Sequence, residues 1–419
     1  MIKNITDSIK YIGVDDYDID LFESQYIVPN GMAYNSYIIE DEQITILDTA
    51  DARKGEEWWQ NLTTALDGRE PSYLIVHHAE PDHSSLIAEA MKKYPAMRIV
   101  ATPKAIQMMP QFFEGIDFAS RSIAVKEGDT LTTGKHTLQF LHAPMVHWPE
   151  VMVTFDTTDK VLFSADAFGK FGALATDEPW ACEARRYYFN ICGKYGVQVQ
   201  TLLKKAAALP VEIICPLHGP VLTENLGYYV ALYDTWSKYE PETEGVFVAY
   251  ASIHGGTGVA ARKLAEMLTA AGAPKVAVTD LSRCDLAEAV EDAFRYSHMV
   301  LCASSYDAGV FTPMADFLHH LKSKNFQRRK VALLENGSWA PTAGRVMRSM
   351  LEEMKAIEIV EPMVTIRSRM KESDLPAMQQ LAEEYKFPNQ SYMSRYYRRI
   401  MGETPTDTRR NNKNNITIF

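Results

Sequence analysis

The sequence contains few cysteines, and none of them form a pair with metal-binding spacing. Its five cysteines are Cys182, Cys192, Cys215, Cys284 and Cys302, and no two of them make a CxxC motif. An odd number of widely spaced cysteines argues against a disulfide framework, a structural zinc site and an iron–sulfur cluster. We therefore expect reduced, mostly buried thiols.

Long apolar runs and an excess of positive charge are also missing. No run approaches the about 18 apolar residues that a membrane span needs. Residues 1–14 lack the apolar core of a signal peptide. The 43 Lys and Arg residues are outnumbered by 54 Asp and Glu residues, which gives a formal charge of -11, whereas a nucleic-acid binder needs a basic face. The sequence predicts a cytoplasmic protein that binds neither membranes nor nucleic acid.

The chain is long enough for two ordinary globular domains. It has 419 residues, of which 46% are hydrophobic and 23% charged. A single hydrophobic core seldom organises more than about 250 to 300 residues. Glu and Pro interrupt the apolar pattern at residues 237–244, where we place the linker.

Residues 77–85, HHAEPDHSS, hold the densest group of potential metal ligands. Five side chains that can bind a metal stand within seven residues there: His77, His78, Glu80, Asp82 and His83. The apolar run at residues 73–76 predicts a buried strand that ends in a loop presenting these groups, and Ser84 or Ser85 is expected to cap a helix running to about Tyr94. Imidazole and carboxylate groups without a thiol suit iron, zinc or manganese. The alternative is a polar surface loop.

Three further candidate ligands follow later strands of the first half. His147 lies in HAPMVHWP, Asp166 ends FSAD, and His218 lies in CPLHGP. Each of them alone could equally be a buried polar residue with a hydrogen-bond partner. The segment at residues 185–191, RRYYFNI, is expected to be a helix, either near the site or purely structural.

The second half changes its hydrophobic period. From Gly245, five apolar strands alternate with amphipathic helices, which predicts a parallel, doubly wound sheet with its ligand past the carboxyl ends of the strands. Three loops at that edge are rich in glycine, serine and aromatic residues. The first could cradle a phosphate with its backbone N–H groups, although turn chemistry alone would also explain each loop. The candidate cofactor-binding residues are Ser252, His254, Gly255, Gly256, Thr257, Ser304, Ser305, Tyr306, Asp307, Ala308, Gly309, Asn336, Gly337, Ser338 and Trp339.

Taken together, these motifs resemble the flavodiiron proteins, also called A-type flavoproteins. The resemblance rests on the order HxExDH, His, Asp and HG, followed by the three loops, and it covers about residues 20–385. It implies an α/β fold, in which an N-terminal metallo-β-lactamase-like αββα sandwich precedes a flavodoxin-like doubly wound parallel sheet. The expected domains are residues 1–243, which hold the diiron site, and residues 244–390, which bind FMN. Residues 391–419 would form a basic tail, either mobile or in contact with another subunit.

The resemblance also implies a ligand set and an activity. One iron would be held by His78, Glu80 and His147, and the other by Asp82, His83 and His218, with Asp166 bridging. Hydrolases of the same fold usually have a His where Glu80 stands, and a hard carboxylate favours iron over zinc. The implied protein is an oxidoreductase that passes electrons from a reduced donor to FMN and then to the iron pair. It would reduce dioxygen to water, nitric oxide to nitrous oxide, or both.

The partners implied by the resemblance are an electron donor and a second copy of the chain. Without CxxC pairs the chain has no rubredoxin domain, so the donor would be a separate rubredoxin or a reduced deazaflavin coenzyme. The expected assembly is a head-to-tail homodimer or a dimer of dimers. Two alternatives stay open. One is a dizinc hydrolase with a flavodoxin-like appendage, and the other is an electron-carrier flavoprotein whose metal domain is vestigial.

Overall fold

The structure is a computed structural model, and it describes residues 2–176, 178–385 and 387. The chain divides into two compact units, Met1–Lys238 and Tyr239–Phe419. The basic segment 391–419 lies outside the described residues. Within those residues no helix is both long and apolar enough to span a membrane. The five cysteines are all described, and each is a free thiol.

The first unit is a sandwich of two β-sheets. A seven-stranded sheet has the order β1-β2-β7-β8-β9-β10-β11, and a five-stranded sheet has the order β12-β13-β14-β15-β16. The strands of the first sheet are β1 (Lys3–Asn4), β2 (Ile9–Tyr11), β7 (Tyr37–Ile39), β8 (Thr45–Leu47), β9 (Tyr73–Ile75), β10 (Arg98–Ala101) and β11 (Ser122–Ala124). Those of the second are β12 (Thr130–Thr132), β13 (Thr137–His142), β14 (Met152–Asp156), β15 (Val161–Phe163) and β16 (Ile213–Cys215). Two short ribbons pair β3 (Val14–Asp16) with β6 (Met32–Tyr34) and β4 (Leu21–Phe22) with β5 (Tyr26–Ile27).

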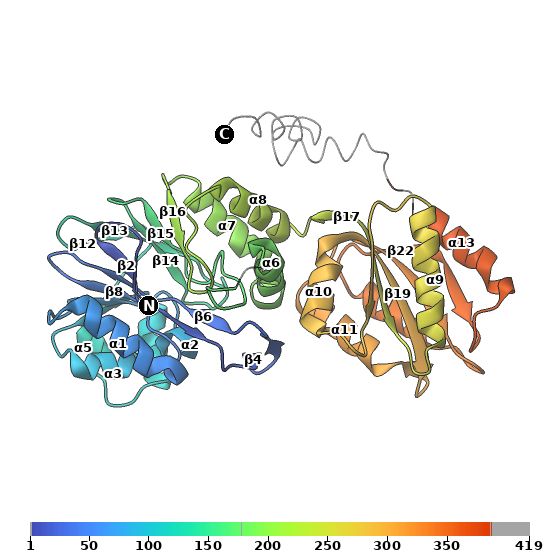
Figure 1. Cartoon of the computed structure of the whole chain (residues 1–419), viewed down its shortest axis with the longest axis horizontal. Coiled ribbons are helices and arrows are strands. Elements are labelled where there is room, and N and C mark those ends of the chain that lie inside the picture. Colours follow the sequence, from blue (N-terminus) through green and yellow to red (C-terminus); the bar gives the residue numbers. More distant parts are fainter. Residues whose placement is uncertain (1, 177, 386, 388–419) are drawn as a thin grey trace, which may run out of the picture. The chain divides into compact units, whose positions relative to one another are not determined.

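Apolar side chains from both sheets form the core of this sandwich. Ile39, Ile75 and Val100 of the first sheet pack in one cluster with Phe140 and Phe163 of the second. Figure 1 shows helices on both outer faces, so the unit has the expected αββα layers. The helices are α1 (Gly55–Leu66), α2 (Pro81–Ser84), α3 (Ile87–Lys93), α4 (Pro103–Met108), α5 (Phe118–Arg121), α6 (Trp180–Ile191), α7 (Gly196–Ala206) and α8 (Leu226–Ser237). Short 3₁₀ turns are η1 (Ala52–Lys54), η2 (Met109–Gln111) and η3 (Gly193–Tyr195).

The second unit is a parallel sheet with the strand order β18-β17-β19-β21-β22. Its strands are β17 (Thr243–Ala251), β18 (Val276–Asp280), β19 (Tyr296–Tyr306), β21 (Lys330–Asn336) and β22 (Glu358–Ile366), and β20 (Gly309–Val310) pairs antiparallel with the end of β19. The interior strand β17 is buried from Gly245 to Ala251 because helices cover both faces. The order reverses between β17 and β19, and this switch point is where a doubly wound sheet binds its ligand.

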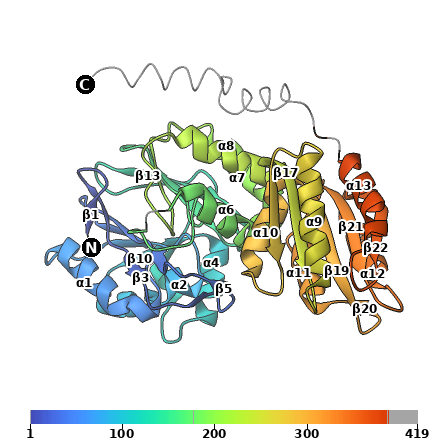
Figure 2. The ribbon, with the colours of Figure 1, turned by 45° about the vertical axis from the view of Figure 1, so that its right-hand side comes forward.

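Five helices cover the two faces of this sheet. They are α9 (Gly256–Ala270), α10 (Leu286–Arg295), α11 (Thr312–Ser323), α12 (Ala343–Glu352) and α13 (Leu375–Glu384), with a 3₁₀ turn η4 (Glu372–Asp374) before the last. Small and branched side chains of α9 and α13 pack against the sheet in one cluster. Figures 1 and 2 show α10 and α11 on one side of the sheet and α13 on the other. The expected fold class is confirmed for both units.

One expectation about local structure is wrong. Residues 81–84 form the short helix α2 rather than a loop, because Pro81 suits the first position of a helix. Neither serine caps the next helix, α3, which is preceded by Leu86. The Ser84 hydroxyl instead donates to the carbonyl of Ala79 at 2.8 Å, and that of Ser85 donates to Pro81. Both hydroxyls therefore stabilise α2.

Candidate metal centre and flavin cavity

The structure brings all seven predicted metal ligands together at one edge of the sandwich. They come from the ends of separate elements: His78 and Glu80 follow β9, Asp82 and His83 lie on α2, His147 follows β13, Asp166 follows β15, and His218 follows β16. Loops that leave neighbouring strands at the same edge are a common place for functional residues, because the sheets hold the loop ends rigidly.

Four of these side chains form a first donor group. The Nε2 atoms of His78 and His147 each lie 3.1 Å from Oε2 of Glu80. Oδ2 of Asp166 lies 3.1 Å from His147 Nε2 and 3.5 Å from His78 Nε2. Metal–ligand bonds of about 2.0 to 2.2 Å place neighbouring donor atoms about 3 Å apart. The spacing of this group therefore matches the coordination shell of a single transition-metal ion.

Three other side chains form a second donor group beside the first. The Nε2 atoms of His83 and His218 are 3.1 Å apart. Oδ2 of Asp82 lies 3.3 Å from His218 Nε2 and 3.6 Å from His83 Nε2. Oδ1 of Asp166 is 3.9 Å from His218 Nε2, whereas its Oδ2 faces the first group. Asp166 thus presents one oxygen to each group, which is the arrangement of a bridging carboxylate.

Several buried carboxylate oxygens of the two donor groups lack a hydrogen-bond partner, which is consistent with a site that binds two cations. Both carboxylate oxygens of Asp82 and Oδ1 of Asp166 are buried without a hydrogen-bond partner. Buried polar atoms are usually satisfied, so such a group needs a partner. Burial alone would lower the pKa of His147, but Asp166 and Glu80 raise it to about 9. Burial would raise the pKa of Glu80, but His147 and His78 lower it to about 2. The carboxylates therefore attract positive charge strongly into this site.

Hydrogen bonds at the outer ring nitrogens fix two of the histidines. The Nδ1 atom of His78 lies 2.8 Å from Oε1 of Glu150, which also accepts the backbone N–H of Ala79 at 3.0 Å. The Nδ1–H of His218 donates to the carbonyl of Ala33 at 2.8 Å. An acceptor at Nδ1 leaves Nε2 as a lone pair aimed into the site, which is the usual device at metal-bound histidines. Glu150 was not predicted from the sequence, because a single acid after a Trp-Pro pair forms no recognisable motif.

His77 faces away from both donor groups. Its Nδ1 contacts the buried carboxylate of Asp48, and its Nε2 lies 2.7 Å from the hydroxyl of Thr154. Successive residues of an extended segment point to opposite sides, so only one of the two adjacent histidines can face the site. His77 is instead a buried structural residue between the two sheets.

Aromatic rings line the second donor group. The ring of Phe22, at the end of β4, lies 5.4 Å from His218 edge-on, and Tyr187 lies 5.5 Å from the same imidazole. Tyr187 comes from the segment 185–191, which forms part of helix α6 as expected. The helix therefore supplies a wall of the site, and its other buried face packs against α8 through Trp236. This apolar wall separates the donor atoms from bulk water.

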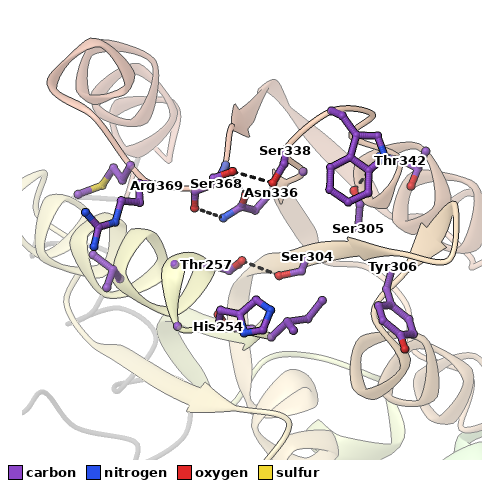
Figure 3. A pocket seen from close by; sticks show the side chains of 18 of the residues that line it. His254, Thr257, Ser304, Ser305, Tyr306, Asn336, Ser338, Thr342, Ser368 and Arg369 are labelled. Atoms are coloured by element: carbon purple, nitrogen blue, oxygen red, sulfur yellow. Dashed lines mark hydrogen bonds between the residues drawn. The ribbon is translucent and has the colours of Figure 1, made fainter.

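The second unit has a cavity of about 1150 Å³ at the carboxyl edge of its sheet. All three predicted loops line it, and Figure 3 shows their side chains around the opening. A bond of 2.8 Å between the hydroxyls of Thr257 and Ser304 ties the first loop to the second. The Oγ atom of Ser252 is buried in the first loop without a hydrogen-bond partner. Trp339 is 89% exposed and Tyr306 is 47% exposed at the cavity, which leaves both rings free to cover a planar ligand.

The predicted cofactor-binding residues line this cavity with one exception. Gly309 is not part of the lining, and its carbonyl accepts a hydrogen bond from the Thr342 hydroxyl at 2.8 Å. Ser305 lines the cavity, but its Oγ also accepts the N–H groups of Thr342 and Ala343 at the start of α12. Some lining residues were not predicted: Ile253 and Ala340 within the loops, and Val259, Arg262, Thr342, Ser368, Arg369 and Met370 outside them. Arg262 and the last loop have no phosphate-loop signature, so no motif identified them.

Comparisons with known proteins agree with this architecture. Residues 32–219 match the family described as ODP family beta lactamase. The anaerobic nitric oxide reductase flavorubredoxin of Vibrio vulnificus is 29% identical over 352 residues, which are 81% of this chain and 70% of that protein. The chain is thus similar in sequence to a flavorubredoxin over most of its length, in agreement with the resemblance to flavodiiron proteins.

Solved flavodiiron structures share the whole two-unit fold. The rubredoxin oxygen:oxidoreductase of Desulfovibrio gigas has a TM-score of 0.86 at 24% identity, covering 92% of this chain and 97% of that one. The flavodiiron protein of Giardia intestinalis has a TM-score of 0.84 at 23% identity, covering 92% and 96%. The name of the V. vulnificus relative agrees with the prediction of an oxidoreductase and disfavours the hydrolase alternative.

Proposed function

We propose that this protein acts as a flavodiiron protein, and that it reduces dioxygen to water, nitric oxide to nitrous oxide, or both, with electrons that pass from FMN to a non-haem diiron centre. The observation that carries the proposal is the shared carboxylate of Asp166 between two groups of donor atoms, with Glu80 rather than a His in the first group. The donor set is rich in hard oxygen ligands and lacks thiols, which favours iron. The named activities of the relatives in V. vulnificus and D. gigas support the same reading.

The proposed metal ligands divide as the two donor groups do. His78, Glu80 and His147 would hold one iron, Asp82, His83 and His218 would hold the other, and Asp166 would join them. When bound, the iron pair would supply the reduction of the gas, and FMN would accept electrons from the donor and pass them on singly. In the neutral, metal-bound form of each ring, the Nδ1 partners Glu150 and the Ala33 carbonyl would leave the Nε2 lone pair facing the metal. Phe22 and Tyr187 exclude water from the second group.

FMN would occupy the cavity of the second unit. The backbone N–H groups of residues 252–257 at the start of α9 suit its phosphate, and the exposed rings of Tyr306 and Trp339 suit its flavin ring. The chain has no GxGxxG motif for a nicotinamide cofactor and no CxxC pair. The electron donor would therefore be a separate reduced protein such as a rubredoxin, or a reduced deazaflavin coenzyme.

Metal and flavin analysis of the purified protein tests this proposal. We expect about two irons and one FMN per chain, which follows from the two donor groups and the single phosphate loop. Stoichiometric zinc with little iron would contradict the proposal and favour the hydrolase. FMN without any bound metal would favour the electron carrier.

We also propose that the working assembly is a homodimer in which FMN of one chain serves the iron pair of its partner. The proposal rests on the resemblance to flavodiiron proteins, and complementation tests it. Glu80→Ala should lose iron, and a bulky replacement of Gly256 should lose FMN, so that each homodimer is inactive. Verified mixed dimers should regain activity, and inactive mixed dimers would contradict the arrangement.

A further inference from the structure

Two arginines face the flavin cavity without a carboxylate partner among the described residues. Arg262 and Arg369 both line the cavity. The guanidinium of Arg262 donates to the hydroxyl of Tyr250 at 3.0 Å and lies over the same ring at 5.7 Å. Several other cations of this unit pair with acids, as Arg348 does with Glu361. In a chain with a formal charge of -11, two unpaired guanidinium groups at one cavity indicate an anionic ligand there.

Both arginines are held next to the start of α9. A Cβ on Gly258 would lie 3.3 Å from Nη1 of Arg262, so this guanidinium reaches back to the first turn of the helix. A Cβ on Gly256 would lie only 2.6 Å from the carbonyl oxygen of Ser368, so the loop carrying Arg369 touches the same turn. The helix terminus adds its own positive field, because its first N–H groups have no partner within the helix.

Hydrogen bonds fix the loop that carries Arg369. Asn336 donates to the carbonyl of Ser368 at 3.0 Å and accepts the backbone N–H of the same residue at 3.0 Å. The hydroxyls of Ser338 and Ser368 are 2.6 Å apart. This fourth loop, after β22, is therefore anchored to the third loop rather than free to move independently.

The cavity has a cationic end and an aromatic end. Figure 3 shows Arg369 on the opposite side of the cavity from Tyr306, with Thr257 and His254 between them. We infer that Arg262 and Arg369 clamp the phosphate of the flavin and make the site selective for a phosphorylated flavin over riboflavin. The inference rests on the proposed function, because it assigns the phosphate end of the proposed FMN site. Planar guanidinium groups bind phosphate oxygens in a fork that lysine cannot reproduce.

Flavin binding to the deflavinated full-length protein tests the clamp. Arg262→Met and Arg369→Met should each weaken FMN binding about ten- to hundredfold, because each removes a charge-assisted hydrogen bond. The same variants should change riboflavin binding less than about twofold, since riboflavin has no phosphate. Added salt should weaken FMN binding to the wild type more than to the double variant. Quenching of flavin fluorescence measures all of these affinities.

Arg345→Met is the matched control, because Arg345 is an exposed arginine on α12 outside the cavity lining. It should leave the affinity for both flavins unchanged. Equal losses of FMN and riboflavin binding in the two cavity variants would overturn the clamp and show that the arginines only support the fold. Unchanged FMN binding in the double variant would also overturn it. A wild-type protein that binds neither flavin would instead refute the flavin part of the proposed function.

Discussion

The hydrogen-bond partners of His78 and His218 lie outside the two donor groups, and they determine which ring nitrogen is available to bind a metal. Each imidazole has an acceptor at Nδ1, a carboxylate for His78 and a carbonyl for His218, and this leaves Nε2 free for a metal. The sequence predicted both histidines from their motif context. It did not predict their acceptors, because Glu150 and Ala33 become neighbours of the site only through the fold.

Replacing Glu150 should reduce metal binding without touching a ligand. Glu150→Ala removes the acceptor for His78 and should weaken iron at the first donor group about ten- to hundredfold. Glu150→Gln keeps a carbonyl oxygen for the same contacts, so its loss of iron affinity should be smaller. Iron content after dialysis against a chelator measures the effect, and Glu56→Gln on the exposed face of α1 is the control. Full iron retention in Glu150→Ala would contradict the positioning role.

A histidine–aspartate pair away from the metal site, His136 with Asp156, should make the free energy of unfolding depend on pH. Nδ1 of His136 lies 2.9 Å from Oδ2 of buried Asp156, and Nε2 lies 2.8 Å from the Ser8 hydroxyl. The hydrogen bond that His136 donates to Asp156 raises the pKa of the imidazole, with smaller contributions from Asp159 and Asp41. A raised folded pKa stabilises the protein below the ordinary value of about 6.5, and this contribution disappears as the pH rises through the folded pKa.

We therefore expect His136→Asn to cost on the order of 1 kcal/mol of unfolding free energy at about pH 6. The difference from the wild type should shrink steadily as the pH rises above the folded pKa of the imidazole. Urea unfolding of both proteins at matched metal content, over a pH series, measures it. A difference that stays constant or grows with pH would contradict the assigned protonation.

At the scale of elements, the period of the apolar residues predicted most strands and helices of the second unit. Strands β17, β19 and β21 are buried on both faces, and such apolar runs are visible in the sequence. Helix α2 was not predicted, because four residues are too few to show a helical period. The polar residues at 81–84 instead favoured the prediction of a loop. The loop after β22 was missed as a cavity wall for a similar reason, since only the sheet order places it beside α9.

The residue that caps helix α4, Thr102, also forms a hydrogen bond to Glu150, the residue that contacts His78 of the metal site. The Thr102 hydroxyl accepts the N–H of Ala105 at 3.1 Å and donates to the carbonyl of Glu150 at 3.0 Å. Thr102→Val keeps the shape but loses both bonds, and it should cost about 1 kcal/mol of unfolding free energy. Thr102→Ser keeps the hydroxyl and should cost much less. Denaturant unfolding compares the two, and equal losses would show that packing of the methyl group, not the cap, matters.

At the scale of the whole molecule, the order of motifs along the chain was the most informative feature of the sequence. A ligand cluster at residues 77–85 and three later strand-end residues predicted one site, and the structure gathers them at one edge of the sandwich. The family resemblance already implied two ligand groups with Asp166 between them, and the structure adds which oxygen of Asp166 faces each group. Sequence alone could not show the cationic end of the flavin cavity, which combines α9 with a loop more than a hundred residues later.

The reoxidation of bound, reduced FMN by dioxygen and by nitric oxide tests the central claim most directly. It should be followed by flavin absorbance after rapid mixing, in the wild type and in Glu80→Ala with its FMN intact. Glu80 belongs to the first donor group and not to the flavin cavity, so the variant should keep FMN and lose iron. We predict fast reoxidation of the wild type by at least one gas and a rate lower by orders of magnitude in the variant. Equal rates in both proteins with both gases would contradict electron transfer through the proposed diiron centre.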